Sequence, residues 1–112
     1  MKIAIPVVNG KLSMHFGHCQ VFVLIEVDEA KKEILNEEQL VPPAHEPGLL
    51  PRWLAEQKVS IIIAGGMGQM AQGLFTQNGI KVVVGAGSKS PKELVLDYLN
   101  NALETGSNLC DH

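Results

Sequence analysis

Apolar runs alternate with short polar turns along the chain, and the length of each run separates strands from helices. The run at 2–8 is short and nearly continuously apolar, and the run at 20–28 is β-branched and apolar on both faces, which is typical of buried strands. A more polar strand is expected at 33–41. The turn dipeptide Asn9-Gly10 follows the first run. The third run is polar enough for the edge of a sheet, so we expect an antiparallel meander in this part of the chain.

The rest of the chain predicts helices and strands in alternation. Apolar residues at helical spacing mark a helix that ends at Gln57, and buried strands are expected at 60–64 and 80–84. A second helix between these strands should end at Asn78-Gly79. It is expected to turn four apolar residues inward: Met70, Ala71, Leu74 and Phe75.

A third helix closes the pattern. Ser90-Pro91-Lys92-Glu93 is a capping box with proline at the first helical position, and an apolar stripe follows over 94–103 until Gly106. The element order β-β-β-α-β-α-β-α predicts a three-layer α/β fold, with a five-stranded mixed sheet flanked by helices. We expect ribonuclease H-like topology and a single domain over residues 1–112.

Composition narrows the function. The 112 residues are 46% hydrophobic and 19% charged, which is typical of a globular protein. No apolar run approaches the roughly 20 residues of a membrane span, and the first residues lack a secretory pattern. We therefore expect a cytoplasmic protein with no membrane partner. The net charge of −3 has the wrong sign for a nucleic-acid binder.

The stretch Met14-His15-Phe16-Gly17-His18-Cys19 holds two of the four histidines and one of the two cysteines. Imidazole and thiolate are the ligands that zinc, copper and iron–sulfur species prefer. On one turn of helix, His15, His18 and Cys19 would share a face. The alternative is a surface loop whose histidines have no common role.

The chain ends in a second group of soft ligands. In an extended tail, Cys110 and His112 face the same side and could hold one metal ion. A frayed terminus without a role is the alternative. The two groups together match no standard spacing of a structural zinc site.

A glycine-rich loop joins a predicted strand to a predicted helix. It consists of Gly65, Gly66, Met67 and Gly68. Backbone N–H groups at such a junction can bind an anion, although close packing of strand against helix also needs small residues. A dinucleotide site is disfavoured because the next strand is not followed by the required carboxylate.

Enzymatic interpretations have less support. A two-metal nuclease of this topology needs carboxylates on the first strand, and residues 2–8 contain none. Cys19 with His15 could form a nucleophile pair, but no orienting third group is visible. His45 stands alone in a proline-bounded loop, and its role is open.

Several segments together resemble the dinitrogenase iron–molybdenum cofactor biosynthesis family. They are Ile3-Ala4-Ile5-Pro6-Val7 with Asn9-Gly10-Lys11, His15-Phe16-Gly17, Glu26-Val27-Asp28, Ala64-Gly65-Gly66-Met67-Gly68, Asn78-Gly79-Ile80-Lys81-Val82 and the closing helix. The match runs in order over nearly the whole chain. The resemblance implies a ribonuclease H-like fold and binding without catalysis, with a metal–sulfur cluster held in transit or storage.

Carried over to this chain, the resemblance assigns the family histidine to His15 and the glycine loop to 65–68. We expect Met14, Phe16, Gly65, Gly66, Met67 and Gly68 to line the cluster. The metal ligands are expected to be His15, His18, Cys19, Cys110 and His112. The ligands beyond His15 are departures from the family pattern and leave the cargo open between an iron–molybdenum cofactor precursor and an iron–sulfur cluster. A donor or acceptor protein for the cluster is the expected partner, and the alternative is a regulatory protein with one zinc or copper ion.

Overall fold

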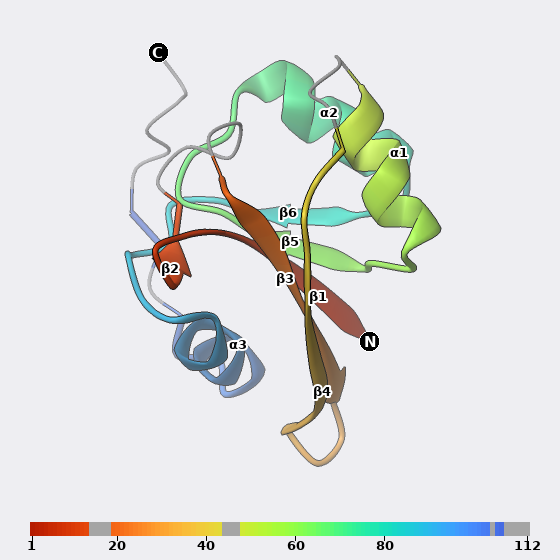
Figure 1. Ribbon diagram of the computed structural model, residues 1–112. Coiled ribbons are helices and arrows are strands. Elements are labelled where there is room, and N and C mark those ends of the chain that lie inside the picture. Colours follow the sequence, from red (N-terminus) through yellow and green to blue (C-terminus); the bar gives the residue numbers. More distant parts are fainter. Residues whose placement is uncertain (14–18, 44–47, 104, 107–112) are drawn as a thin grey trace.

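The structure, a computed structural model, describes residues 1–13, 19–43, 48–103, 105 and 106. One mixed sheet forms the centre of the molecule, and helices lie on both of its faces (Figure 1). The strands are β1 (Lys2–Val8), β2 (Lys11–Leu12), β3 (Val21–Asp28), β4 (Glu33–Leu40), β5 (Ile61–Ile63) and β6 (Lys81–Val83). The helices are α1 (Leu49–Glu56), α2 (Gln69–Gln77) and α3 (Pro91–Leu99).

The sheet has the spatial order β4-β3-β1-β5-β6. β1, β3 and β4 pair antiparallel, which confirms the predicted meander, while β1, β5 and β6 run parallel. β4 lies at the edge, as its polarity predicts, and most of its side chains are exposed.

The described residues form six strands where the sequence predicts five. The additional strand is β2, which pairs only with the end of β1. Asn9 and Gly10 both have positive φ, 53° and 79°, as a tight two-residue hairpin turn requires. The turn was predicted, but two residues are too short for any periodic pattern to reveal a strand.

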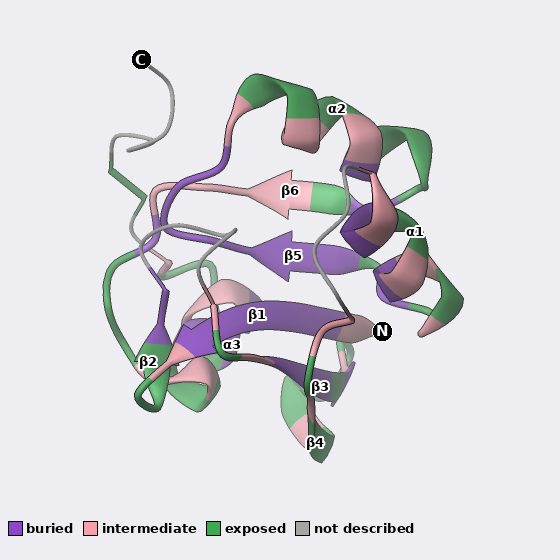
Figure 2. Cartoon of the chain, turned by 45° about the horizontal axis from the view of Figure 1, so that its top comes forward, coloured by how far each residue is buried: buried purple, intermediate pink, exposed green. Residues whose placement is uncertain are grey.

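The sheet separates two apolar clusters because successive side chains of a strand point to opposite faces. On one face, Ala4, Phe22 and Ile62 pack with residues of α1 and α2. On the other, Ile3 and Ile5 pack with residues of α3. Figure 2 shows β1 and β5 as almost wholly buried between these helices. The chain is therefore an α/β protein with a mixed sheet.

Two details of the helices differ from the expectation. Met70, predicted to face inward, is 84% exposed, because it lies five positions before the buried Phe75 and so roughly 140° around the helix from it. α3 ends at Leu99 and does not continue to Gly106. Asn101 adopts the left-handed conformation, with φ 56°, and stops the helix early.

Candidate functional site

Three loops meet at the carboxyl ends of the parallel strands, an edge that we call the carboxyl edge. They are the connections after β1, β5 and β6, at 9–20, 64–68 and 84–90, and the first of them includes the short strand β2. Their backbones are joined directly: the N–H of Leu12 donates to the carbonyl of Lys89 at 3.0 Å, and that of Gly85 to the carbonyl of Gly65 at 2.9 Å. In open α/β sheets, ligands bind at this end of the strands.

The first loop is fixed at the end of β1 by both of its described parts. The N–H of Ser13 donates to the carbonyl of Pro6 at 2.8 Å, and the N–H of Gln20 donates to the carbonyl of Val7 at 2.9 Å. The segment between them starts and finishes at the carboxyl edge. Met14, His15, Phe16 and His18, which are predicted site residues, lie outside the described residues.

Cys19 is the predicted metal ligand of this loop that the structure describes. It is half-buried and packs on the α1 and α2 side of the sheet, against the cluster that contains Phe22 and Met67. Burial raises the pKa of its thiol, and a backbone hydrogen bond opposes this in part. The thiol is therefore neutral at neutral pH, and a metal ion must displace its proton to bind.

The glycine loop is buried where it leaves β5. Gly65, Gly66 and Met67 are all buried, and Gly68 begins α2 without a side-chain cap. The side-chain amide of Gln72 donates to the carbonyl of Met67 at 2.9 Å and holds the loop against the helix. Residues 59–80 contain no charged side chain, so an anion bound here would meet no carboxylate from this segment.

The described end of the chain returns to the same edge. Thr105 forms a β-bridge with Ala86, and the N–H of Gly106 donates to the carbonyl of Gly85 at 2.6 Å. Nothing in the sequence signals this contact between two loops. Cys110 and His112 lie outside the described residues, but Cys110 is four residues from Gly106, a span of at most about 14 Å.

His45 also lies outside the described residues. The segment that leads to it leaves β4 at Leu40, which pairs with Phe22 at the start of β3. All three segments that hold the histidines and cysteines therefore connect to the end of the sheet where β1 finishes and β3 begins.

The described residues contain no group of three histidine, cysteine, aspartate or glutamate side chains arranged to hold a metal ion. Cys19 and Met67 nevertheless bring two sulfur atoms to one apolar cluster beside the loop. Uncharged buried backbone with soft donors fits a sulfide-rich anion better than it fits a hard cation such as Mg²⁺. None of the helices in the described part of the chain is long and apolar enough to cross a membrane.

The fold and the carboxyl edge define a small α/β protein in which a glycine loop without charged side chains lies at one end of the parallel strands. Comparison with known proteins makes the assignment more specific, because residues 1–101 match the family described as dinitrogenase iron–molybdenum cofactor. The chain belongs to this family.

Three known proteins resemble the chain over nearly its whole length. The chain is 36% identical over 109 residues to protein MJ0580 of Methanocaldococcus jannaschii. The aligned region covers 93% of this chain and 90% of the relative. The crystal structure of protein PH0822 superposes with a TM-score of 0.85 at 26% identity, covering 94% of each chain. The fold also matches protein MJ0327 of Methanocaldococcus jannaschii, with a TM-score of 0.75 at 18% identity and 96% of each chain covered.

Proposed function

We propose that this protein binds a metal–sulfur cluster at its carboxyl edge and carries or stores it without catalysing a reaction. The cargo is an iron–molybdenum cofactor precursor or a related iron–sulfur cluster. A donor or acceptor protein delivers or receives it. Family membership supports the class of cargo, and the chemistry of the edge supports binding.

The observation that carries the proposal is the common origin of the soft ligands. Ser13, which precedes the 14–18 segment, is hydrogen-bonded to the end of β1, and Cys19, which follows the segment, packs in the same apolar cluster as Met67 of the glycine loop. Gly106, which precedes the tail, is hydrogen-bonded to Gly85 at the same edge. His15, His18, Cys19, Cys110 and His112 are thus within reach of one cluster. The N–H groups of Gly65, Gly66 and Gly68 are suited to donate to its sulfides.

The same arrangement favours exchange over permanent binding. Loop and tail ligands give a less rigid site than four cysteines on regular elements. The raised pKa of Cys19 adds to this, because protonation of the thiol competes with the metal. A carrier needs such a balance, since it has to release what it binds.

We also propose that the fold is ribonuclease H-like. Without the short β2, the strands in chain order occupy spatial positions 3-2-1-4-5. The second of them is antiparallel to the other four. This order and this single reversed strand support the label, in agreement with what the family resemblance implies.

Anaerobic reconstitution of the full chain with ferrous iron and sulfide tests the proposed function. We expect charge-transfer absorption bands, together with bound iron and acid-labile sulfide, and we expect His15→Ala and Cys19→Ser to reduce all three. Wild-type protein without such bands at stoichiometric metal would contradict cluster binding. Bound zinc or copper without sulfide would instead support a mononuclear regulatory protein.

Two glycines provide a matched control. Gly68 lies in the glycine loop and Gly73 within α2, and a Cβ atom at either position meets open space. Gly68→Leu should lower cluster uptake because its side chain enters the space beside the loop, whereas Gly73→Leu should leave uptake unchanged. Equal uptake by both variants would contradict the assignment of the loop.

A further inference from the structure

A second concave site lies on the α3 side of the sheet, opposite the face against which Cys19 and Met67 pack. It is an open cavity of about 470 Å³, which is within the range of small-molecule sites. One helix, α3, packs on this face of the sheet, whereas two helices, α1 and α2, pack on the other face (Figure 1). The single helix leaves room for a cavity. Val83, Leu99 and Leu103 supply its apolar wall.

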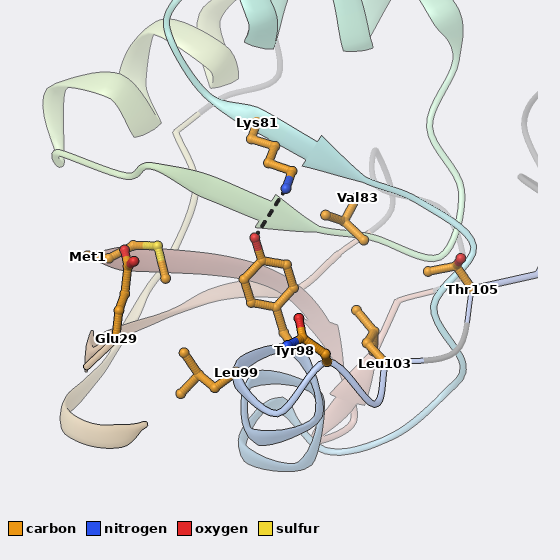
Figure 3. Close-up of a pocket in the computed structure, with 9 residues that line it drawn as sticks. Met1, Glu29, Lys81, Val83, Tyr98, Leu99, Leu103 and Thr105 are labelled. Carbon is orange, nitrogen blue, oxygen red and sulfur yellow. Dashed lines mark hydrogen bonds between the residues drawn. The ribbon is translucent and has the colours of Figure 1, made fainter. Parts of the chain in front are cut away.

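A lysine and a tyrosine meet within this cavity. Lys81 Nζ donates to the Tyr98 hydroxyl at 3.3 Å and lies 5.6 Å from the centroid of the tyrosine ring (Figure 3). Lys81 is the first residue of β6 and Tyr98 belongs to the last turn of α3, so the pair connects the edge strand to the helix.

Lys81 differs from the lysines that form ion pairs. Lys2, Lys89 and Lys92 each have a carboxylate oxygen within 3.9 Å. Within the described part of the chain Lys81 forms no ion pair: its neighbours are a phenol hydroxyl and an aromatic face, and neither carries a negative charge. An ammonium with one N–H engaged can donate two more hydrogen bonds, and a tyrosine that accepts one can still donate its own proton.

The polar groups around this pair suit an oxyanion. Asn101 and Thr105 also line the cavity and add an amide and a hydroxyl. Glu29 lines it as well, and Figure 3 shows Glu29 and Thr105 on opposite sides of Tyr98. That carboxylate, in a chain with a net charge of −3, repels any anion, and it repels a dianion more strongly than a monoanion.

We propose that this cavity binds a small organic carboxylate, with the carboxylate on Lys81 and Tyr98 and its apolar body against Val83, Leu99 and Leu103. This site is separate from the carboxyl edge. It requires no metal, so its failure and the failure of cluster binding are distinguishable.

Titration of metal-free, full-length protein with hexanoate and phenylacetate, followed by amide NMR shifts, tests the proposal. We expect saturable shifts at Lys81, Val83, Tyr98 and Leu103. Phenyl phosphate and inorganic phosphate, as dianions, should bind more weakly. Tighter binding of either phosphate would overturn the preference for a carboxylate, and shifts that never saturate would overturn the site.

Three variants separate binding from structural support. Lys81→Gln should weaken hexanoate binding about tenfold, because a hydrogen bond to a charged group is lost. Tyr98→Phe keeps the ring but removes the hydroxyl, and should weaken binding less. Lys11→Gln makes the same charge change outside the cavity and should have no effect. If Lys81→Gln changes the melting temperature but binds hexanoate as Lys11→Gln does, the pair is only structural and the proposal is wrong.

Discussion

Burial makes Cys19 a poor nucleophile, which supports its proposed role as a metal ligand over the alternative of a catalytic cysteine. Because burial raises the pKa of its thiol, little thiolate is present at neutral pH. In a Cys110→Ser background, we expect iodoacetamide to label Cys19 several-fold more slowly in the folded protein than in urea. Faster labelling in the folded protein would indicate an activated thiol and would contradict this reading.

The same residue gives stability a dependence on pH. In the folded state Cys19 keeps its proton at pH values where the unfolded chain loses it, so the unfolded state binds fewer protons there. The contribution of Cys19 is fully present below the ordinary pKa of a thiol and falls as pH rises above about 8. Cys19→Ser should remove this fall, as measured by urea unfolding at several pH values.

At the scale of elements, all three helices end in the same way. A residue with positive φ follows each helix: Lys58 at 66°, Gly79 at 78° and Asn101 at 56°. In each case its N–H and that of the next residue donate back into the last turn, as in a Schellman motif. Only one of the three is the glycine that this motif favours, so the other two carry backbone strain.

Replacing Lys58 with glycine should relieve that strain. Lys58→Gly is expected to raise the free energy of unfolding by about 0.5–1 kcal/mol, because glycine adopts the left-handed conformation without a Cβ penalty. Lys58→Ala is the control, since it removes the same side chain but keeps the Cβ atom. Urea unfolding should show a gain for glycine only, and an equal gain for alanine would place the effect in the side chain.

These helix ends also show what local patterns can predict. Gly79 was identified from the sequence, as were β1 and the cap of α3, where Ser90 Oγ accepts from the N–H of Glu93 at 3.4 Å. The end of α3 was not identified from the sequence. Asparagine is a weaker signal for the left-handed conformation than glycine, and the apolar stripe continues past Asn101. Local chemistry thus predicts where elements occur better than where they stop.

At the scale of the whole molecule, the site depends on topology more than on motifs. The sequence identified Cys19 and the glycine loop as candidates, but their common edge follows only from β1 and β5 being parallel neighbours. No pattern in the sequence predicts the contact between Gly85 and Gly106, because it joins two irregular segments through a backbone hydrogen bond. Chemistry-bearing residues can be found one by one in a sequence, whereas their convergence requires the strand order.

That backbone contact leads to a prediction for the whole chain. Gly85 has φ 83°, and a Cβ atom there would overlap the carbonyl oxygen of Gly106. Gly85→Ala should therefore separate the end of the chain from the carboxyl edge and cost about 1–3 kcal/mol of unfolding free energy. Gly87→Ala is the matched control, because a Cβ atom at that position has no neighbour within 4 Å.

The position of proteolytic cleavage distinguishes local release of the end of the chain from destabilisation of the whole fold. We expect limited proteolysis with mass spectrometry to show early cleavage after residue 100 in Gly85→Ala, with the strands still protected, because few other described contacts hold that segment. If the tail supplies ligands to the cluster, the same variant should lose cluster uptake in anaerobic reconstitution while Gly87→Ala retains it. Identical cleavage in the two variants would mean that the Gly85–Gly106 contact does not anchor the tail. The argument that Cys110 can reach the carboxyl edge would then be wrong.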